Sequence, residues 1–146
     1  MTKYDRPTAP SRLFSRTFAW LARKGLAPSN SVQIEVKGRK SGELRSAVIN
    51  VVEFDGQRYF VAPRGETEWV RNVRAAGGEA VVNRRGRRRV RLEEVPVEQR
   101  PPIIQKYLGE NAMATKSFFG VDPKSDLSVF EGIAAKHPTF RIVEVE

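Results

Sequence analysis

The sequence predicts a mainly β fold, in which an antiparallel sheet closes into a small barrel with flanking helices. Successive strand-like segments are joined by hairpin signals, such as Asp55-Gly56 and the Arg84-Arg85-Gly86 turn, rather than by regular βαβ crossovers. One helix-like segment interrupts this series, and no G-x-G-x-x-G or P-loop motif is present. This order favours a barrel over a doubly wound parallel sheet.

The expected strands are short segments that alternate apolar and polar residues or are rich in β-branched ones. They are residues 32–36, 46–54, 58–62, 79–83, 87–95 and 140–145. The expected helices cover residues 11–24, 68–76, 96–110 and 126–136, and a loop is expected at 115–123. Ser11 is placed to cap the first helix, Gly77-Gly78 to end the second, and Pro101-Pro102 to begin the regular part of the third.

Length and composition predict one globular domain over residues 11–146, preceded by a tail at 1–10. The chain of 146 residues is 40% apolar and 29% charged. It has no cysteine, which excludes disulfides and thiolate chemistry, and His137 is its only histidine, which argues against a Ser-His-Asp triad or a multi-histidine metal site. No apolar run approaches the roughly 18 residues of a membrane span, so we expect a cytoplasmic protein.

The positive charge is concentrated in the first two thirds of the chain. Residues 1–91 hold 20 Lys and Arg against 8 Asp and Glu, whereas residues 92–146 hold 6 against 9, which together make the net charge of +9. Such a field favours an acidic ligand, an anionic membrane or nucleic acid. The hairpin around Gly86 carries six arginines but no aromatic residue for base stacking, so we expect no nucleic acid partner and interpret it as a solvated sheet edge.

The segment from Lys37 to Arg45 is the strongest candidate binding element. Gly38 and Gly42 bracket an Arg-Lys-Ser triplet directly after a predicted strand. Glycines let a backbone turn tightly and approach a ligand, and Arg, Lys and Ser donate hydrogen bonds to phosphate or carboxylate oxygens. The pattern predicts an anion site at a strand end; the alternative is an ordinary basic hairpin turn.

Several motifs, taken in order, carry a resemblance to a known family. They are Gly38-Arg39-Lys40-Ser41-Gly42, Arg45 with the strand 46–52, Asp55-Gly56, Tyr59-Phe60-Val61-Ala62, Trp69-x-x-Asn72-Val73-Arg74-Ala75, Glu79-Ala80-Val81-Val82 and His137-Pro138-Thr139-Phe140-Arg141-Ile142. Their order and spacing, from about Leu13 to the end, resemble the deazaflavin-dependent nitroreductase family, actinobacterial proteins that bind coenzyme F420. The resemblance implies a split β-barrel of the FMN-binding type.

The resemblance also implies a set of cofactor-binding residues. Phosphate contacts fall on Arg39, Lys40 and Ser41, and the strand that lines the deazaflavin corresponds to Arg45, Ser46, Ala47, Val48, Ile49 and Asn50. A second loop near the phosphate and the ring corresponds to Ala62, Pro63, Arg64 and Gly65, and the helix that closes over the ligand to Trp69, Val70 and Arg71. Trp69 could equally be a core residue, and a structural role for Asn72 is favoured over a functional one.

Two departures from the family pattern bear on the expected ligands, the first on the local cofactor contacts and the second on the substrate. The link from Gly65 to Trp69 is short, and Phe118 and Phe119 stand where some relatives have substrate-facing tyrosines. Phenylalanine donates no proton, so a reaction that needs a tyrosine there, such as nitroimidazole reduction, is disfavoured and an apolar substrate stacked on Phe118 fits better. The alternative is that Phe118 and Phe119 anchor the loop in the core.

The resulting hypothesis is an oxidoreductase that transfers hydride from reduced F420 to an electron-poor small molecule of the quinone, enone or nitro type. No catalytic side chain and no metal site are predicted, because the proton can come from solvent. A non-catalytic protein that binds deazaflavin, or FMN in its place, is the alternative. Either a monomer or a homodimer is expected. The basic amphipathic helix 11–24 is compatible with packing on the domain, covering the site or contacting the inner face of the membrane.

Overall fold

The computed structural model of the protein describes residues 31–145, apart from the side chains of residues 112–117. The predicted tail at 1–10 and the predicted helix at 11–24, with its membrane contact, therefore lie outside the described residues. Among the described helices, none is long and apolar enough to cross a membrane.

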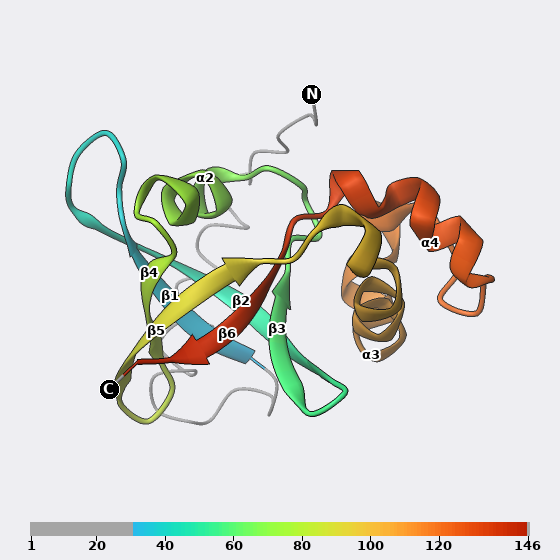
Figure 1. Ribbon diagram of the computed structural model, residues 1–146, viewed down its shortest axis with the longest axis horizontal. Helices are drawn as coiled ribbons and strands as arrows, with labels where there is room; N and C mark the ends of the chain where they lie inside the picture. The colour runs from blue at the N-terminus through green and yellow to red at the C-terminus, as the bar shows by residue number, and fades with distance from the viewer. Residues whose placement is uncertain (1–30, 146) are drawn as a thin grey trace.

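Six antiparallel strands close into a barrel, as predicted (Figure 1). The order around the barrel is β1-β2-β3-β6-β5-β4. The strands are β1 (Ser31–Lys37), β2 (Leu44–Phe54), β3 (Gln57–Val61), β4 (Glu79–Asn83), β5 (Arg87–Glu94) and β6 (Thr139–Glu144). All six predicted strands are present, each within two residues of its expected bounds. The mainly β split-barrel fold class is confirmed.

The long strand β2 changes its pairing partner along its length, from β1 in its first half to β3 in its second. Residues 44–50 of β2 pair with β1, whereas only residues 51–54 pair with β3. Strand β3 itself ends at Val61 and pairs onward with β6. Within residues 31–145, the first half of β2 therefore has a neighbouring strand on one edge only. Along its other edge, the backbone N–H and C=O groups pair with no strand among these residues.

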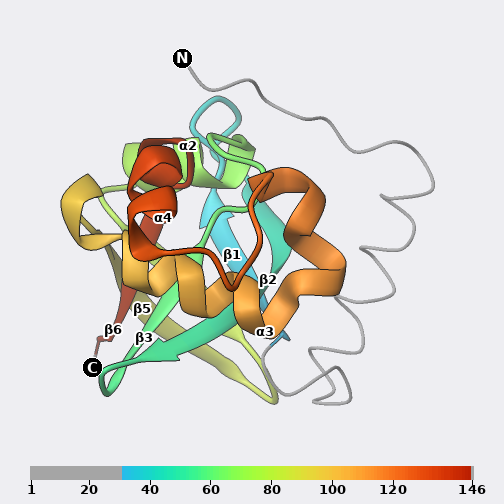
Figure 2. The same ribbon diagram turned by 90° about the vertical axis from the view of Figure 1, so that its right-hand side faces the viewer.

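The helices lie on two different sides of the barrel. Helix α2 (Glu68–Ala75) sits against β1 and β2 beside the β1–β2 turn. On another side, α3 (Pro101–Phe119) lies against β2 and β3, and α4 (Leu127–Ile133) packs on α3 (Figures 1 and 2). The short 3₁₀ segments η1 (Val97–Gln99) and η2 (Ala134–Lys136) precede α3 and follow α4.

Helix α3 corrects the loop that the sequence predicts at 115–123, because the helix continues to Phe119 and ends at Gly120, whose φ is +68°. It bends at Asn111, where φ is −126° and ψ is 24°. The Asn111 side-chain amide donates to the Tyr107 carbonyl, four residues earlier. This bond takes the acceptor that the helical backbone would use, which accounts for the bend.

Two apolar clusters hold these layers together. The first fills the barrel and includes Ile34, Phe60, Val73 and Phe140. The second lies between the outer face of β2 and β3 and the α3–α4 layer, and it includes Val52, Val61, Ile104, Leu108 and Phe130. Both clusters contain side chains with no solvent exposure, so each supplies part of the hydrophobic stabilisation.

The arginine-rich β4–β5 hairpin is not a sheet edge, which corrects the interpretation from sequence. Strand β5 pairs with β4 on one side and with β6 on the other. Several of its arginines form ion pairs with neighbouring strands: Arg87 with Glu35 at 3.1 Å and Arg88 with Glu144 at 3.3 Å. A closed barrel leaves no edge here to protect. The arginines of β5 are solvent-exposed, as predicted, and two of them also act as cross-strand partners.

Candidate functional site

The turn between β1 and β2 requires the glycines that bracket it. Gly38 donates its N–H to the Glu43 carbonyl at 2.7 Å, and Gly42 donates to the Gly38 carbonyl at 2.9 Å. Gly42 has φ +74°, and a Cβ on Gly38 would lie 2.9 Å from Ser41 Oγ. These contacts give the turn one conformation, which presents the side chains of Lys40 and Ser41 to solvent.

Arg39 fastens this turn to helix α2. Its backbone N–H donates to Asn72 Oδ1 at 3.1 Å, and its guanidinium Nη1 donates to the same oxygen at 2.8 Å and to Glu68 Oε2 at 2.7 Å. Asn72 is buried. The predicted phosphate ligand Arg39 is thus committed in part to holding the turn on α2, with Asn72 as its clamp.

Three cations surround one carboxylate at this corner of the molecule. The hydrogen bond from Arg39 lowers the pKa of Glu68, and the charges of Lys40 and Arg71 lower it further. Within the described residues, neither Lys40 nor Arg71 forms an ion pair. The single carboxylate of Glu68 does not neutralise the three cations. The corner therefore retains an excess of positive charge, which favours the binding of an anion.

Ser41 and Arg45 have local roles. Ser41 Oγ accepts from the Glu43 N–H at 3.2 Å, and Arg45 Nη2 donates to the same oxygen at 3.5 Å. Both side chains are exposed, as are Ser46 and the neighbouring Leu44. Further along β2, Ile49 is buried in the barrel and Ala47 packs against the same cluster, so these residues can offer a ligand only their backbone.

Asn50 belongs to a polar chain on the outer side of the barrel. Ser31 Oγ donates to Asn50 Oδ1 at 2.7 Å, and Asn50 Nδ2 donates to Asn111 Oδ1, also at 2.7 Å. Its amide thus joins β1, β2 and the bend of α3. Val48, two residues earlier, is half-buried. The side chain of Asn50 is therefore used in holding these elements together, and its backbone remains a predicted part of the site.

The loop after β3 is held from both of its ends. The Ala62 N–H donates to the Pro138 carbonyl at 2.9 Å, and His137 Nδ1 lies 3.0 Å from the Ala62 carbonyl oxygen. Gly65, at φ +83°, donates back to the Ala62 carbonyl at 3.2 Å. The half-buried Pro63 lies within this turn. These hydrogen bonds, on either side of Arg64, hold the backbone from which its side chain extends.

Arg64 and Phe118 meet above this loop. The Arg64 guanidinium carbon lies 5.0 Å from the centre of the Phe118 ring, within the range of a cation–π contact. Both residues are half-buried. Phe119, by contrast, is buried, and its ring centre lies 4.2 Å from that of His137 and 6.1 Å from that of Tyr107. Phe119 thus has the core position that the sequence left open, and of the two only Phe118 remains partly accessible.

Helix α2 contributes packing as well as charge. Val70 is fully buried in the barrel cluster. Trp69 is half-buried, with its ring centre 6.5 Å from that of Phe60 in an edge-on arrangement and 5.7 Å from that of Phe140. Trp69 therefore closes this end of the barrel while part of it remains exposed. It combines the two roles that the sequence could not separate.

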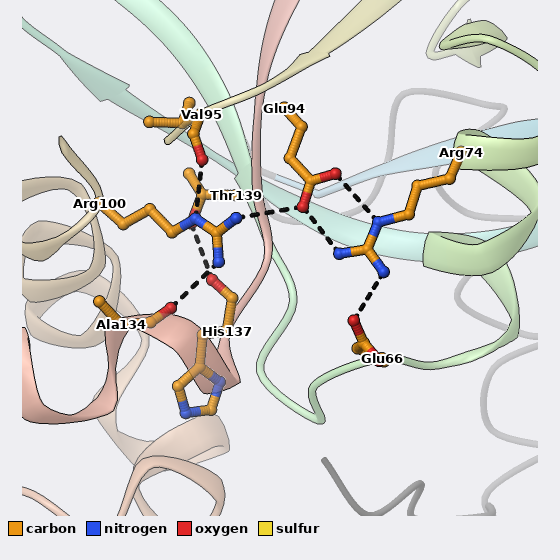
Figure 3. Close-up of polar contacts among 8 residues, drawn as sticks. All are labelled: Glu66, Arg74, Glu94, Val95, Arg100, Ala134, His137 and Thr139. Carbon is orange, nitrogen blue, oxygen red and sulfur yellow. Dashed lines mark hydrogen bonds and ion pairs between the residues drawn. The ribbon is translucent and has the colours of Figure 1, made fainter. Parts of the chain in front are cut away.

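A chain of ion pairs that no sequence signal indicated links α2 to the start of α3 (Figure 3). Arg74 bonds Glu66 at 2.6 Å and Glu94 at 2.7 Å, and Glu94 also accepts from Arg100 at 3.1 Å. Arg100 is only 5% exposed and donates further to the Val95 and Ala134 carbonyls. Each of its three guanidinium nitrogens thus donates a hydrogen bond, which offsets the cost of burying the charge.

Burial shifts the titration of two groups behind the site. Desolvation lowers the pKa of His137, against the opposing hydrogen bond to Ala62, so the imidazole is neutral at pH 7. Desolvation raises the pKa of Tyr107, which keeps its proton. No group of three or more His, Cys, Asp or Glu able to hold a metal occurs within the described residues.

Comparisons with known proteins support the fold. No family model matches the sequence, and no curated protein matches it. Among solved structures, the protein Atu2129 of unknown function from Agrobacterium tumefaciens str. C58 is similar over 99% of this chain, at TM-score 0.56 and 18% identity. This chain spans only 58% of that protein chain.

Two further structures are similar at comparable levels. A chain described as a domain-swapped dimer matches over 92% of this chain and 99% of its own, at TM-score 0.53 and 16% identity. An F420-H2 dependent reductase, FDR-A, matches over 77% of this chain and 93% of its own, at TM-score 0.49 and 19% identity. Such identities show a shared fold and no more, and the last score is too low to carry an argument.

Proposed function

We propose that this protein is an oxidoreductase of the deazaflavin-dependent nitroreductase family, which binds coenzyme F420 at the corner between the β1–β2 turn, the open edge of β2, the Ala62–Gly65 loop and the start of α2. The observation that carries the proposal is the gathering of Arg39, Lys40 and Arg71 around the single carboxylate of Glu68. F420 combines a flat ring with a polyanionic tail. A cationic corner beside an unpaired strand edge suits both parts.

The residues of the corner fit such a ligand in distinct ways. Lys40 and Arg71 have charges not used in ion pairs within the described part of the chain, and Thr67 Oγ1 is a buried oxygen with no hydrogen-bond partner. Arg39 contributes through position as much as charge, because Asn72 holds it beside Lys40. The unpaired edge of β2 offers backbone N–H and C=O groups, and Trp69 and Phe118 offer aromatic surface.

When bound, the reduced deazaflavin supplies a hydride for an electron-poor acceptor such as a quinone, an enone or a nitro compound. The task of this chain is to orient the two partners and limit water between them. Phe118, held by Arg64, is a candidate surface for the acceptor ring. No acid or base of this chain is assigned to the proton transfer, which solvent can provide.

A non-catalytic role with the same ligand is the second candidate. It is favoured by the absence of any described side chain at the corner that could act as a general acid near pH 7, since the nearby titratable groups are Lys, Arg and a carboxylate with a lowered pKa. FMN is the alternative ligand in both cases, and the protein acts as a monomer or a homodimer.

The test is a titration of the purified protein with oxidised F420 and with FMN, followed by ligand fluorescence, and an assay of F420H2 oxidation with quinone, enone and nitro acceptors. The proposal expects micromolar or tighter binding of F420, weaker binding of FMN and oxidation with at least one acceptor. Binding without oxidation would leave the non-catalytic role. If neither ligand bound, the proposed function would be wrong.

A further inference from the structure

The first turn of helix α2 has hydrogen-bond donors that no group in the described part of the chain accepts from. Thr67 is the N-cap residue, with φ −78° and ψ 178°, but its side chain makes no capping hydrogen bond. The backbone N–H groups of Glu68, Trp69 and Val70 also have no acceptor within the described part of the chain. An N-cap threonine normally accepts from one of these groups. Here the end of the helix is left uncapped.

The Thr67 hydroxyl is itself unsatisfied. The residue is only 8% exposed, and its Oγ1 is the one buried side-chain oxygen or nitrogen without a partner among the described residues. Buried polar groups are almost always hydrogen-bonded, because an unmade bond costs free energy. An unpaired hydroxyl at an uncapped helix start is therefore a feature that a bound group would explain.

The charges around this helix start favour an anion. Arg39, Lys40 and Arg71 surround Glu68. The other acid in the neighbourhood, Glu66, has its pKa lowered mainly by the hydrogen bond from Arg74 and is already paired at 2.6 Å. Both carboxylates are thus engaged by guanidinium groups, and Lys40 and Arg71 are left over. The helix macrodipole adds partial positive charge at the same end.

We propose that the start of α2 is a binding site for a phosphoryl group, in which the Thr67 hydroxyl and the free N–H groups of the first helical turn donate to its oxygens. A phosphoryl group has several acceptor oxygens and matches a set of convergent donors at a helix N-terminus. The inference deepens the proposed function, on which it rests, by assigning the phosphodiester of the cofactor tail to Thr67 and α2. It adds Thr67 to the site, a residue that neither the sequence nor the resemblance had indicated.

The experiment compares ligands with and without this group. F420 is paired with 8-hydroxy-5-deazariboflavin, which has the same ring but lacks the phosphodiester and the rest of the anionic tail. FMN is paired with riboflavin, which lacks only the phosphate. Each is titrated into the wild-type protein, Thr67→Val and Thr67→Ser. Valine keeps the shape of threonine without the hydroxyl, and serine keeps the hydroxyl. Thermal unfolding of each variant without ligand is measured alongside.

The expected result is selective. Thr67→Val should weaken F420 binding by about tenfold, a typical effect of losing one hydrogen bond to a charged group, and leave the phosphate-free ligand unchanged. Thr67→Ser should stay close to wild type. Unliganded Thr67→Val should be as stable as wild type or more so, because the buried hydroxyl is gone. Unchanged F420 binding by folded Thr67→Val would overturn the inference and leave the proposed function intact.

A separate measurement decides the inference if no flavin or deazaflavin binds, which would remove the proposed function. Inorganic phosphate is then added to wild type and to Thr67→Val at constant ionic strength, and the shift in melting temperature is recorded. A larger shift for wild type supports a phosphoryl site at α2. Equal shifts, or none, contradict it.

Discussion

The two helical sides of the barrel treat polar groups in opposite ways. On the α3–α4 side, the buried polar groups are partnered: Arg100 bonds two carbonyls and Glu94, and His137 contacts the Ala62 carbonyl. On the α2 side, the Thr67 hydroxyl has no partner, and Lys40 forms no ion pair within the described residues. One side is built to hold the fold, and the other retains groups that a ligand can use.

The same chain of ion pairs shows how the two sides depend on each other. Glu66 and Glu94 both bond Arg74, which ties the loop before α2 and the helix itself to the end of β5 (Figure 3). Arg100 then connects Glu94 to the start of α3. The α3–α4 side, whose buried polar groups are hydrogen-bonded, thereby holds the α2 side in position. Rigid placement of binding groups lowers the entropy that a ligand must overcome.

The largest expected effect comes from breaking the satisfied side at Arg100. Replacing it by alanine (Arg100→Ala) leaves Glu94 with one partner fewer, the buried Val95 carbonyl without its donor and the Ala134 carbonyl with the His137 N–H alone, so we expect the free energy of unfolding to fall by about 4 kcal/mol. Urea unfolding measures this. Arg58→Ala, which removes an exposed pair 3.7 Å apart, is the control and should change stability by less than about 0.5 kcal/mol. Equal effects of the two variants would contradict the comparison.

The neighbouring phenylalanines at the end of α3 compare a buried ring with a partly exposed one. Phe119→Ala should cost about 3 kcal/mol of unfolding free energy, because its buried ring packs on His137 and Tyr107. Phe118→Ala should cost about 1 kcal/mol, since that ring is half-buried. Chemical denaturation checks both values. The comparison fails if Phe118→Ala is the more destabilising of the two.

A change on the α2 side should affect binding and leave stability alone. Lys40→Ala removes an exposed charge that forms no ion pair among the described residues, so we expect unfolding to change by less than about 0.5 kcal/mol. Affinity for F420 should fall about tenfold, as for loss of one charge-assisted contact. The exposed Lys124, replaced by alanine, is the matched control and should keep full affinity. Calorimetric titration of both variants gives the answer.

The smallest effect is a dependence of stability on pH through His137. Its pKa is lowered in the folded protein, chiefly by desolvation, relative to about 6.5 in the unfolded chain. The unfolded state therefore binds more protons as the pH falls below about 6.5, and stability should decrease in that direction and be independent of this group above it. Unfolding at pH 5.5 and 7.5 tests this. His137→Gln should flatten the slope between them, and an unchanged slope would exclude His137 as its source.

Local pattern was sufficient to predict the strands and the turns. Asp55-Gly56 forms the predicted hairpin, with φ +51° and +78°, and Gly42 takes the left-handed conformation expected at the end of the basic turn. These features depend on residues close together in the chain. For the same reason the fold class could be predicted: hairpin connections limit the topologies available to six strands.

Contacts between residues far apart in the chain could not be predicted from the sequence. Arg39 and Asn72 are 33 positions apart, and only the folded turn reveals that Arg39 is partly used within the protein. Phe118 and Phe119 looked equivalent because a loop was expected there; in a helix, adjacent side chains point in directions about 100° apart, and one is buried. Nor could any local signal show that the Thr67 hydroxyl lacks a partner, since this depends on everything packed around it.

Amide hydrogen exchange with and without saturating F420 tests the central claim, that the ligand binds on the α2 side of the barrel. We predict slower exchange on ligand addition in residues 38–49 and 62–71, including the first turn of α2, and no change in residues 101–111 or 127–137. Protection confined to the α3–α4 side, with none in the β1–β2 turn or at the start of α2, would contradict the account.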